Sequence, residues 1–323
     1  MNKEFKKIVK SIKKAKSIAL FTHTSPDFDA FGSTYAFYYA MTSLGKNPFI
    51  FMKEDLTDDQ KVVFDGNVLV KEDCLPEKFD LLIAFDASSS DRLGDFGKVF
   101  DKTENTILID HHRSLGWKAK YNYVDENKSS CAELVYEVLK ALKIKITSQI
   151  ASSLYLGLSS DTKSFVNTST NKNSFKVALD LLSHGAEVKY INELLYQNKT
   201  LKSLEFKKFL LNNFKIQKDC AYCLVSFEDL NNLGGDKHDC DGYSSSLIAI
   251  SGINYSFNIV EIKEKGVYRV SMRSKNGYDV YTKAVKLGGG GHLCASGATI
   301  IAQNIHEAEK MVLKVVFEEE NGN

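Results

Sequence analysis

The sequence predicts an α/β protein with an N-terminal doubly wound, mostly parallel sheet and a smaller C-terminal α+β domain. Its 323 residues are enough for about two domains with separate cores. Short apolar runs alternate with helical patterns through the first half, which is typical of parallel sheets covered by helices. After about residue 214 the pattern changes to strand-like runs joined by turns.

Four apolar runs in the first half have the length and composition of buried strands. They are SIALFTH (17–23), NPFIFM (47–52), DLLIAFD (80–86) and TILID (106–110). Helical patterns accompany them at 30–44, 129–143 and 147–159. Ligands of such sheets bind beyond the carboxyl ends of the strands, so polar residues at those ends are the first candidates for a functional site.

The N-terminus is predicted to be a basic amphipathic helix that leads into the first strand. Phe5, Ile8, Val9 and Ile12 fall on one face, and lysines fill the other. Such a helix can bind a membrane surface, but packing on the sheet with a solvated lysine face explains the same pattern. We find neither the features of a secretory signal nor a run of about 20 apolar residues, so we expect a cytoplasmic protein without a membrane span.

The second half begins with helical stretches and continues as a mixture of strands and helices. A helix over 171–184 ends at His184-Gly185, a common stop signal. We predict a first domain over 1–186, a helical linker over 187–213 and a second domain over 214–323. The strands predicted there are YCLVSF, SFNIVEIKEK and GVYRVSMRSK, and the helices are 241–251, 278–286 and 305–318.

Composition narrows the classes of ligand. The formal net charge is +1, so there is no global basic field for a long nucleic acid, and an anion must be bound locally. Cys220 and Cys223 form a CxxC motif, with His238 and Cys240 further along, which suggests a zinc site. The motif lies in a strand-like run, however, where positions three apart face opposite ways, so we expect reduced cysteines instead.

Acidic and histidine side chains gather where the predicted strands and one helix end. If the strands are neighbours, these side chains lie together on one rim of the sheet. Taken singly, each has another explanation, because Asp27 or Asp29 could cap a helix and Asp86 could be a turn residue. The set comprises His23, Asp27, Asp29, Asp86, Asp110, His111, His112 and Asp161.

The chemistry of this set favours a site for two divalent metal ions. Carboxylates and imidazoles together suit Mn²⁺, with Mg²⁺, Co²⁺ and Fe²⁺ as competitors. Two cations about 3.5–4 Å apart can lower the pKa of a bridging water and stabilise the charge of an in-line displacement at phosphorus. Without metal, so many carboxylates would repel one another. We therefore prefer a metal site for the whole set over the separate capping and turn roles of its single members.

A run of four glycines, 288–291, precedes His292 in the second domain. Such a run cannot form a stable helix or strand interior, and it lets backbone N–H groups approach an anion closely. His292 could add a donor to a phosphate or a base. A plain flexible turn would explain the glycines as well.

These segments resemble the motifs of a known family. HTSPDFDAFGS (23–33), Asp86, DHH (110–112) and SSDT (159–162) resemble the four motifs of the DHH phosphoesterases. GGGGHLCASGA (288–298) resembles the GGGH signature of the DHHA1 substrate-binding domain. The resemblance spans nearly the whole chain, and the short two-domain NrnA-like subgroup of oligoribonucleases and pAp phosphatases is the most similar.

The resemblance implies a role for each matching position. Asp86 would bridge the two metals, Asp110 would support an imidazole from behind, and His112 would donate a hydrogen bond or a proton to the scissile phosphate. The ligands implied for the first metal are His23, Asp27 and Asp86, and those for the second are Asp29, Asp86, His111 and Asp161. The residues implied for substrate binding are Arg273, Gly289, Gly290, Gly291 and His292.

The activity implied is that of a metal-dependent phosphodiesterase or exonuclease. It would hydrolyse short oligoribonucleotides, including dinucleotides such as pApA or pGpG, to nucleoside 5′-monophosphates, and could also convert pAp to AMP. A cyclic-dinucleotide phosphodiesterase and a non-catalytic nucleotide sensor remain alternatives. Duplex nucleic acid is not expected as a partner, whereas a homodimer is consistent with the sequence.

Overall fold

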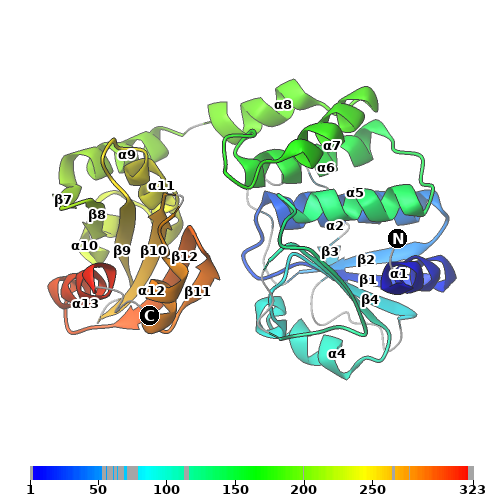
Figure 1. Ribbon diagram of the computed structural model, residues 1–323, viewed down its shortest axis with the longest axis horizontal. Coiled ribbons are helices and arrows are strands. Elements are labelled where there is room, and N and C mark those ends of the chain that lie inside the picture. Colours follow the sequence, from blue (N-terminus) through cyan, green and yellow to red (C-terminus); the bar gives the residue numbers. More distant parts are fainter. Residues whose placement is uncertain are drawn as a thin grey trace. The chain divides into compact units, whose positions relative to one another are not determined.

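The computed structural model describes residues 3–52, 56, 61, 64, 69–70, 79–112, 116–198, 200–263, 266–275 and 277–318. The chain divides into two compact units, Met1–Asn198 and Lys199–Asn323. Figure 1 shows the elements of both. The stretch 187–213, expected to be a linker, is thus shared between the units. It contains α8 (Val188–Asn192), the π-helix η4 (Glu193–Gln197) and α9 (Leu201–Asn213).

The first unit contains a six-stranded sheet in which every neighbouring pair is parallel. The strand order β3-β2-β1-β4-β5-β6 reverses at β1, so the crevice of a doubly wound sheet falls between β1 and β4. The predicted fold class is confirmed for this unit. Its strands are β1 (Ser17–Phe21), β2 (Asn47–Phe51), β3 (Leu69–Val70), β4 (Leu81–Phe85), β5 (Thr106–Asp110) and β6 (Tyr121–Val124).

Helices cover both faces of this sheet (Figure 1). Side chains alternate along β1, so Ile18 and Leu20 pack into one core, while Ala19 and Phe21 pack into the core that contains α4 (Phe96–Lys102). The apolar face of the N-terminal helix is buried in the first of these cores. The helix therefore packs on the sheet, which was the alternative to binding a membrane surface. The helices of the first core are α1 (Lys3–Lys14), α2 (Phe28–Ser43), α5 (Cys131–Ala141), α6 (Ser148–Thr162) and α7 (Lys172–Ser183).

The second unit contains a mixed sheet in the order β11-β12-β10-β9-β8-β7, in which only the β8–β9 pair is parallel among the described strands. This confirms the predicted α+β class. The strands are β7 (Lys215–Gln217), β8 (Cys220–Val225), β9 (Tyr255–Lys263), β10 (Val267–Ser274), β11 (Gly290–His292) and β12 (Ala295–Ile301). The remaining helices are α10 (Phe227–Asn232), η5 (Lys237–Cys240), α11 (Tyr243–Ile248), α12 (Tyr281–Lys286) and α13 (Ile305–Phe317).

The two faces of the second sheet separate the cysteines of the CxxC motif. Cys220 packs with α13 on one face, and Cys223 packs with Cys240 on the other. Both thiols are buried and unpaired, and no cysteine belongs to a potential metal group in the described part of the chain. The CxxC motif therefore contributes packing in this unit, as its strand pattern predicted.

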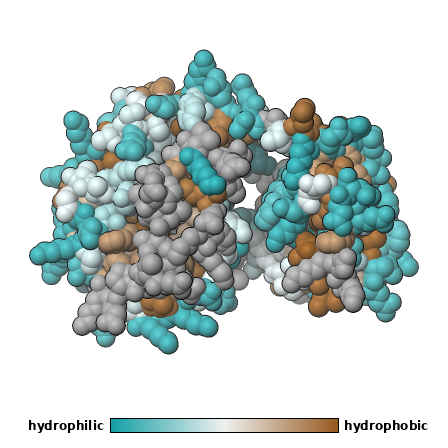
Figure 2. Space-filling model, turned by 180° about the vertical axis from the view of Figure 1, so that it is seen from behind, coloured by the Kyte–Doolittle hydropathy of each residue, from teal (hydrophilic) through white to brown (hydrophobic). Residues whose placement is uncertain are grey.

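The surface of both units is mixed in character. In Figure 2, hydrophilic residues surround smaller hydrophobic patches over the coloured part of each unit. Among the described helices, none is long and apolar enough to cross a membrane.

Candidate metal centre

The acidic and histidine side chains that follow the strands meet at the carboxyl edge of the parallel sheet. The β4 strand lies between β1 and β5, so residues that follow these three strands share one rim. Asp161 joins them from the last turn of α6, a helix that packs against α2. The rim coincides with the reversal of strand order, where doubly wound sheets bind their ligands.

Three overlapping groups of potential ligands form here among the described residues. Within each group, one ligand atom per residue lies within 4.8 Å of the others. Asp86 and His111 each belong to two groups, so the groups are continuous. The groups are His23–Asp27–Asp86, Asp29–His111–Asp161 and Asp86–His111–His112.

Asp27 and Asp29 are held by backbone amides at the starts of two different helices. Asp27 caps α2, because its Oδ1 accepts hydrogen bonds from the amides of Asp29 (3.0 Å) and Ala30 (3.1 Å). Asp29 instead accepts from the amides of Cys131 (2.6 Å) and Ala132 (3.0 Å) at the start of α5. The capping alternative therefore applies to Asp27, and it leaves the Oδ2 atom of that residue for other contacts.

Asp29 is fully buried among other carboxylates. Burial and the negative charges of Asp161 and Asp86 raise the pKa of its carboxyl group well above the usual range. The α5 amides favour the ionised form, but they do not cancel this repulsion. A cation at this position would remove the conflict.

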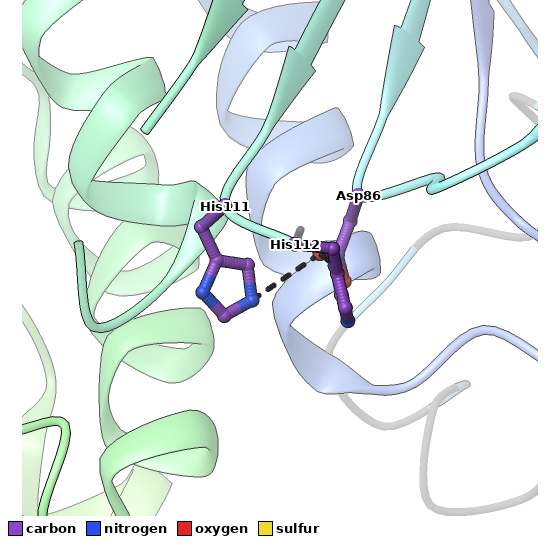
Figure 3. Close-up of side chains that lie close together, drawn as sticks. All are labelled: Asp86, His111 and His112. Atoms are coloured by element: carbon purple, nitrogen blue, oxygen red, sulfur yellow. Dashed lines mark ion pairs between the residues drawn. The ribbon is translucent and has the colours of Figure 1, made fainter. Parts of the chain in front are cut away.

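Asp86 sits at the centre of the three groups. Its φ is +56°, a left-handed conformation that aspartate tolerates better than most residues and that often marks functional sites. Oδ1 lies 3.1 Å from Nδ1 of His112 and 3.5 Å from Nε2 of His111, and Oδ2 lies 3.8 Å from Nε2 of His23. Burial would raise the pKa of Asp86, but these three imidazoles lower it. Figure 3 shows the ring of His111 directed toward Asp86 from the end of β5.

His111 presents Nε2 to three carboxylates. The distances are 3.1 Å to Oδ2 of Asp161, 3.5 Å to Oδ1 of Asp86 and 3.8 Å to Oδ2 of Asp29. The other ring nitrogen, Nδ1, lies 3.3 Å from the carbonyl oxygen of Lys128. Burial alone would lower the pKa of His111, but Asp161 and Asp86 raise it to about 10. A ring with its Nδ1 proton on a carbonyl has Nε2 available for a cation.

Asp110 contacts His112, not His111. Its Oδ1 lies 2.8 Å from Nδ1 of His112 and also accepts a hydrogen bond from the amide of that residue. Burial opposes the charged imidazole, but Asp86 and Asp110 raise the pKa of His112 to about 11. The side chain of His112 is 29% exposed, against 9% for His111, so it is the more accessible of the two to a substrate.

The donor set fits divalent cations. Oxygen and imidazole nitrogen donors in these proportions suit Mn²⁺ and its competitors. Oδ1 of Asp86 and Oδ2 of Asp110 are buried and accept no hydrogen bond of good geometry. A buried carboxylate oxygen without a donor is costly, and a cation beside Asp86 would compensate that oxygen.

The substrate residues expected in the second unit lie on the inner strand β10 and on or beside the edge strand β11. Arg273 pairs with Ala295 across β10 and β12, and Ala295 pairs with His292 across β12 and β11. Residues directly opposite one another share a face, so Arg273 and His292 lie roughly 10 Å apart on one face. Burial lowers the pKa of Arg273. This is the face opposite the core that contains Met272.

The expectation that the glycines cannot lie in a strand is wrong for two of them. Gly290 and Gly291 form β11 with His292, a short edge strand paired with β12. Gly291 has φ +138°, and a Cβ atom there would lie 2.6 Å from the carbonyl oxygen of Ala295. Glycine can therefore lie in this strand, because the neighbouring strand β12 approaches too closely for a residue with a side chain.

Two neighbours of the cluster were not singled out in the sequence. Nη2 of Arg92 lies 3.1 Å from Nδ1 of His23. The sequence feature that could have pointed to Arg92 is its position six residues after Asp86, in the connection that follows the same strand. No sequence feature could have pointed to the carbonyl of Lys128 that contacts His111, because every residue has a backbone carbonyl.

A hollow of about 690 Å³ lies at the opposite, amino edge of the parallel sheet. Its charged side chains are four lysines and one aspartate, and none of them belongs to a potential metal group in the described part. It has the character of a basic surface and not of a hydrolytic centre. Its main charged and polar lining residues are Lys7, Lys10, Lys14, Lys16, Asp80 and Asn105.

Both units of the chain match known domain families. Residues 17–158 match the DHH family, N-terminal domain, and residues 221–318 match the DHHA1 domain. The bifunctional oligoribonuclease and PAP phosphatase NrnA of Thermus thermophilus is 27% identical over 319 residues, which cover 94% of this chain and 90% of that protein. The NrnA of Bacillus subtilis is 25% identical over 309 residues, with coverage of 94% and 95%.

A solved structure shares the fold. The crystal structure of an exopolyphosphatase-related protein from Bacteroides fragilis superimposes with a TM-score of 0.90 at 23% identity. The match covers 98% of each chain, so both units have counterparts there.

Proposed function

The chain belongs to the DHH phosphoesterases with a DHHA1 domain, and from this premise we propose that it is a metal-dependent phosphodiesterase acting on short oligoribonucleotides. Nucleoside 5′-monophosphates are the products, from dinucleotides such as pApA or pGpG, and pAp is converted to AMP. The relatives named as oligoribonuclease and PAP phosphatase support this substrate class. The observation that carries the proposal is the joining of two ligand groups through Asp86 and His111.

In this proposal two divalent cations, most suitably Mn²⁺, share Asp86. His23 and Asp27 complete one site, and Asp29, His111 and Asp161 complete the other. The groups His23–Asp27–Asp86 and Asp29–His111–Asp161 support this division. When bound, the cations supply a water of lowered pKa and stabilise negative charge at phosphorus. The carbonyl of Lys128 and the amides of α5 orient His111 and Asp29 for this role.

His112 acts on the substrate. Its Nδ1 lies 2.8 Å from Oδ1 of Asp110 and 3.1 Å from Oδ1 of Asp86, so Nε2–H is the ring donor that we assign to the scissile phosphate or to the departing ribose oxygen. Asp110 keeps the ring in this orientation. In the second unit, Arg273, His292 and the amides of Gly289, Gly290 and Gly291 are the substrate contacts that we propose.

A substrate panel tests the proposal directly. The purified chain is incubated with Mn²⁺ and pApA, pGpG, pAp, a short single-stranded RNA or a cyclic dinucleotide, and the products are separated by chromatography. We expect nucleoside 5′-monophosphates from the linear substrates and none in the presence of EDTA. Cleavage of the cyclic compound alone would instead indicate a cyclic-dinucleotide phosphodiesterase. Stoichiometric binding of pApA without release of AMP would indicate a sensor.

Location and assembly are part of the same proposal. The described cysteines are free thiols, as is usual in reducing compartments, and this supports a cytoplasmic location. A homodimer is the assembly state that we propose, and light scattering of the purified chain would measure it.

A further inference from the structure

Arg92 stands at the side of the first ligand group. It lies in η3 (Ser90–Leu93), a short turn of helix that follows β4 after Asp86. Its carbonyl accepts a hydrogen bond of 2.6 Å from the amide of Thr24, so this turn is fastened to the loop that carries His23. The imidazole of His23 is buried, whereas Arg92 is exposed, so the guanidinium approaches the group from the solvent side.

Nδ1 of His23 has two polar neighbours, one a hydrogen-bond acceptor and the other a hydrogen-bond donor. The carbonyl oxygen of Thr24 lies at 2.9 Å, and Nη2 of Arg92 lies at 3.1 Å. A carbonyl can only accept a hydrogen bond and a guanidinium can only donate one. Nδ1 therefore bonds Thr24 when it carries a proton, and Arg92 when it does not.

A cation in the first group would decide between these two states. Nε2 of His23 is the ring atom that faces Asp86, at 3.8 Å from Oδ2. If Nε2 uses its lone pair for a cation, the neutral ring carries its proton on Nδ1 and donates it to Thr24. The guanidinium of Arg92 then has no acceptor on His23, and the carboxylates of Asp27 and Asp86 are directed to the cation.

We propose that Arg92 binds a phosphate group of the substrate, and that a cation in the His23–Asp27–Asp86 group releases the guanidinium for this contact. The inference rests on the proposed function, and it adds a residue that the family motifs quoted above do not include. The planar fork of donors on arginine matches the oxygens of a phosphate, and its charge persists at all ordinary pH values. Metal and nucleotide would thus bind in a linked manner through one imidazole nitrogen.

Calorimetry with AMP tests this without any turnover. AMP is titrated into the full chain, with and without saturating Mn²⁺, for the wild type, Arg92→Gln and Lys98→Gln. Lys98 is the matched control, because it is an exposed cation on the neighbouring helix α4 and has no place in the cluster. Arg92→Gln should weaken AMP binding about 10–100-fold with Mn²⁺ present. It should have a much smaller effect without Mn²⁺, and Lys98→Gln should change neither value.

A direct Mn²⁺ titration tests whether Arg92 binds phosphate or instead positions His23. Arg92→Gln should bind Mn²⁺ within about threefold of the wild type, because the metal-bound ring donates to Thr24 and not to Arg92. Arg92→Lys keeps the charge but lacks the fork, so it should recover only part of the AMP affinity. Thermal unfolding confirms that each variant is folded.

Several outcomes would overturn the inference. One is a loss of Mn²⁺ affinity in Arg92→Gln with unchanged AMP affinity, which would make Arg92 a positioning residue for His23. Others are an equal loss of AMP affinity with and without Mn²⁺, or a wild-type chain that does not bind AMP. A chain that binds AMP through Arg92 but hydrolyses no dinucleotide would refute the proposed reaction and leave this inference standing.

Discussion

Nε2 of His111 lies 3.1 Å from Oδ2 of Asp161, and this contact joins the end of β5 to the last turn of α6. Burial raises the pKa of Asp161, although the hydrogen bond with His111 opposes the shift. The same contact helps to raise the pKa of His111 to about 10. Without a cation, the raised pKa values of His111 and Asp161 therefore favour the protonated forms of these two groups. A bound metal would displace such protons.

Removing the Asp161 carboxylate should empty one metal site and leave the other. In Asp161→Asn we expect the Mn²⁺ content to fall from about two ions per chain to about one, and turnover of pApA to fall at least about 100-fold. Metal analysis of the dialysed protein measures the first and product release the second. Asp180→Asn is the control, because this aspartate lies on α7 outside the groups. Retention of both ions would contradict the assignment of Asp161.

Asp86→Asn should abolish activity while preserving the backbone. Asparagine tolerates the left-handed conformation at this position, so the change removes the charge without adding strain. Both proposed sites lose a ligand, and turnover should fall at least about a thousandfold because a cation pair contributes several kcal/mol. Steady-state kinetics with saturating Mn²⁺ provide the measurement. A variant with a tenth of the wild-type rate would rule out a bridging role.

Affinity for Mn²⁺ should rise with pH. The pKa of His111 is raised to about 10 in the absence of metal, so this ring carries a proton at pH 7 that the cation must displace. Below that pKa, each released proton weakens binding by about tenfold per pH unit as the pH falls. Titrations at pH 7, 8 and 9, in buffers that differ in ionisation enthalpy, measure the affinity and the number of protons released. An affinity independent of pH would count against His111 as a ligand.

The same raised pKa has a consequence for the metal-free chain. A histidine whose pKa is higher in the folded state stabilises that state fully below its ordinary pKa of about 6.5, and the contribution is lost as the pH rises toward 10. The melting temperature of the EDTA-treated protein should therefore decrease over this range. Excess Mn²⁺ should reduce the decrease, because the cation replaces the proton as the partner of the carboxylates.

Two adjacent glycines should respond differently to alanine. In Gly291→Ala the new methyl group would lie 2.6 Å from a carbonyl oxygen at φ +138°, so we expect a loss of about 1–3 kcal/mol and a higher KM for pApA. In Gly290→Ala nothing lies within 4 Å of the new atom, so stability should be nearly unchanged. Chemical denaturation and kinetics of both variants measure the difference. Equal effects would show that the close approach at Gly291 is unimportant.

The sequence predicted the parallel sheet well because four of its strands are continuous apolar runs. The two missed strands lack this signal. β3 has only two residues, and β6 (Tyr121–Val124) is half-buried throughout, with no apolar run. Short or half-buried edge strands depend on pairing with a neighbour more than on their own composition.

The members of the candidate site were also accessible from sequence, since the carboxyl-edge rule selects the residues that follow strands. Their individual contacts were not. Which of two adjacent imidazoles faces Asp110 depends on the path of the chain after β5, and the structure selects His112. The partner of Arg92 likewise depends on how its turn is fastened to Thr24. Such contacts follow from tertiary structure and have no local pattern.

The two ligand groups also differ in when the ribosome delivers them. His23, Asp27 and Asp86 are all present once the chain has been made through β4. The second group needs Asp161 at the end of α6, and Asp29 is held in place only when the amides of Cys131 and Ala132 have been added. The two groups of potential ligands are therefore completed in the order in which the chain is synthesised, the first once Asp86 is added and the second only when Asp161 is added.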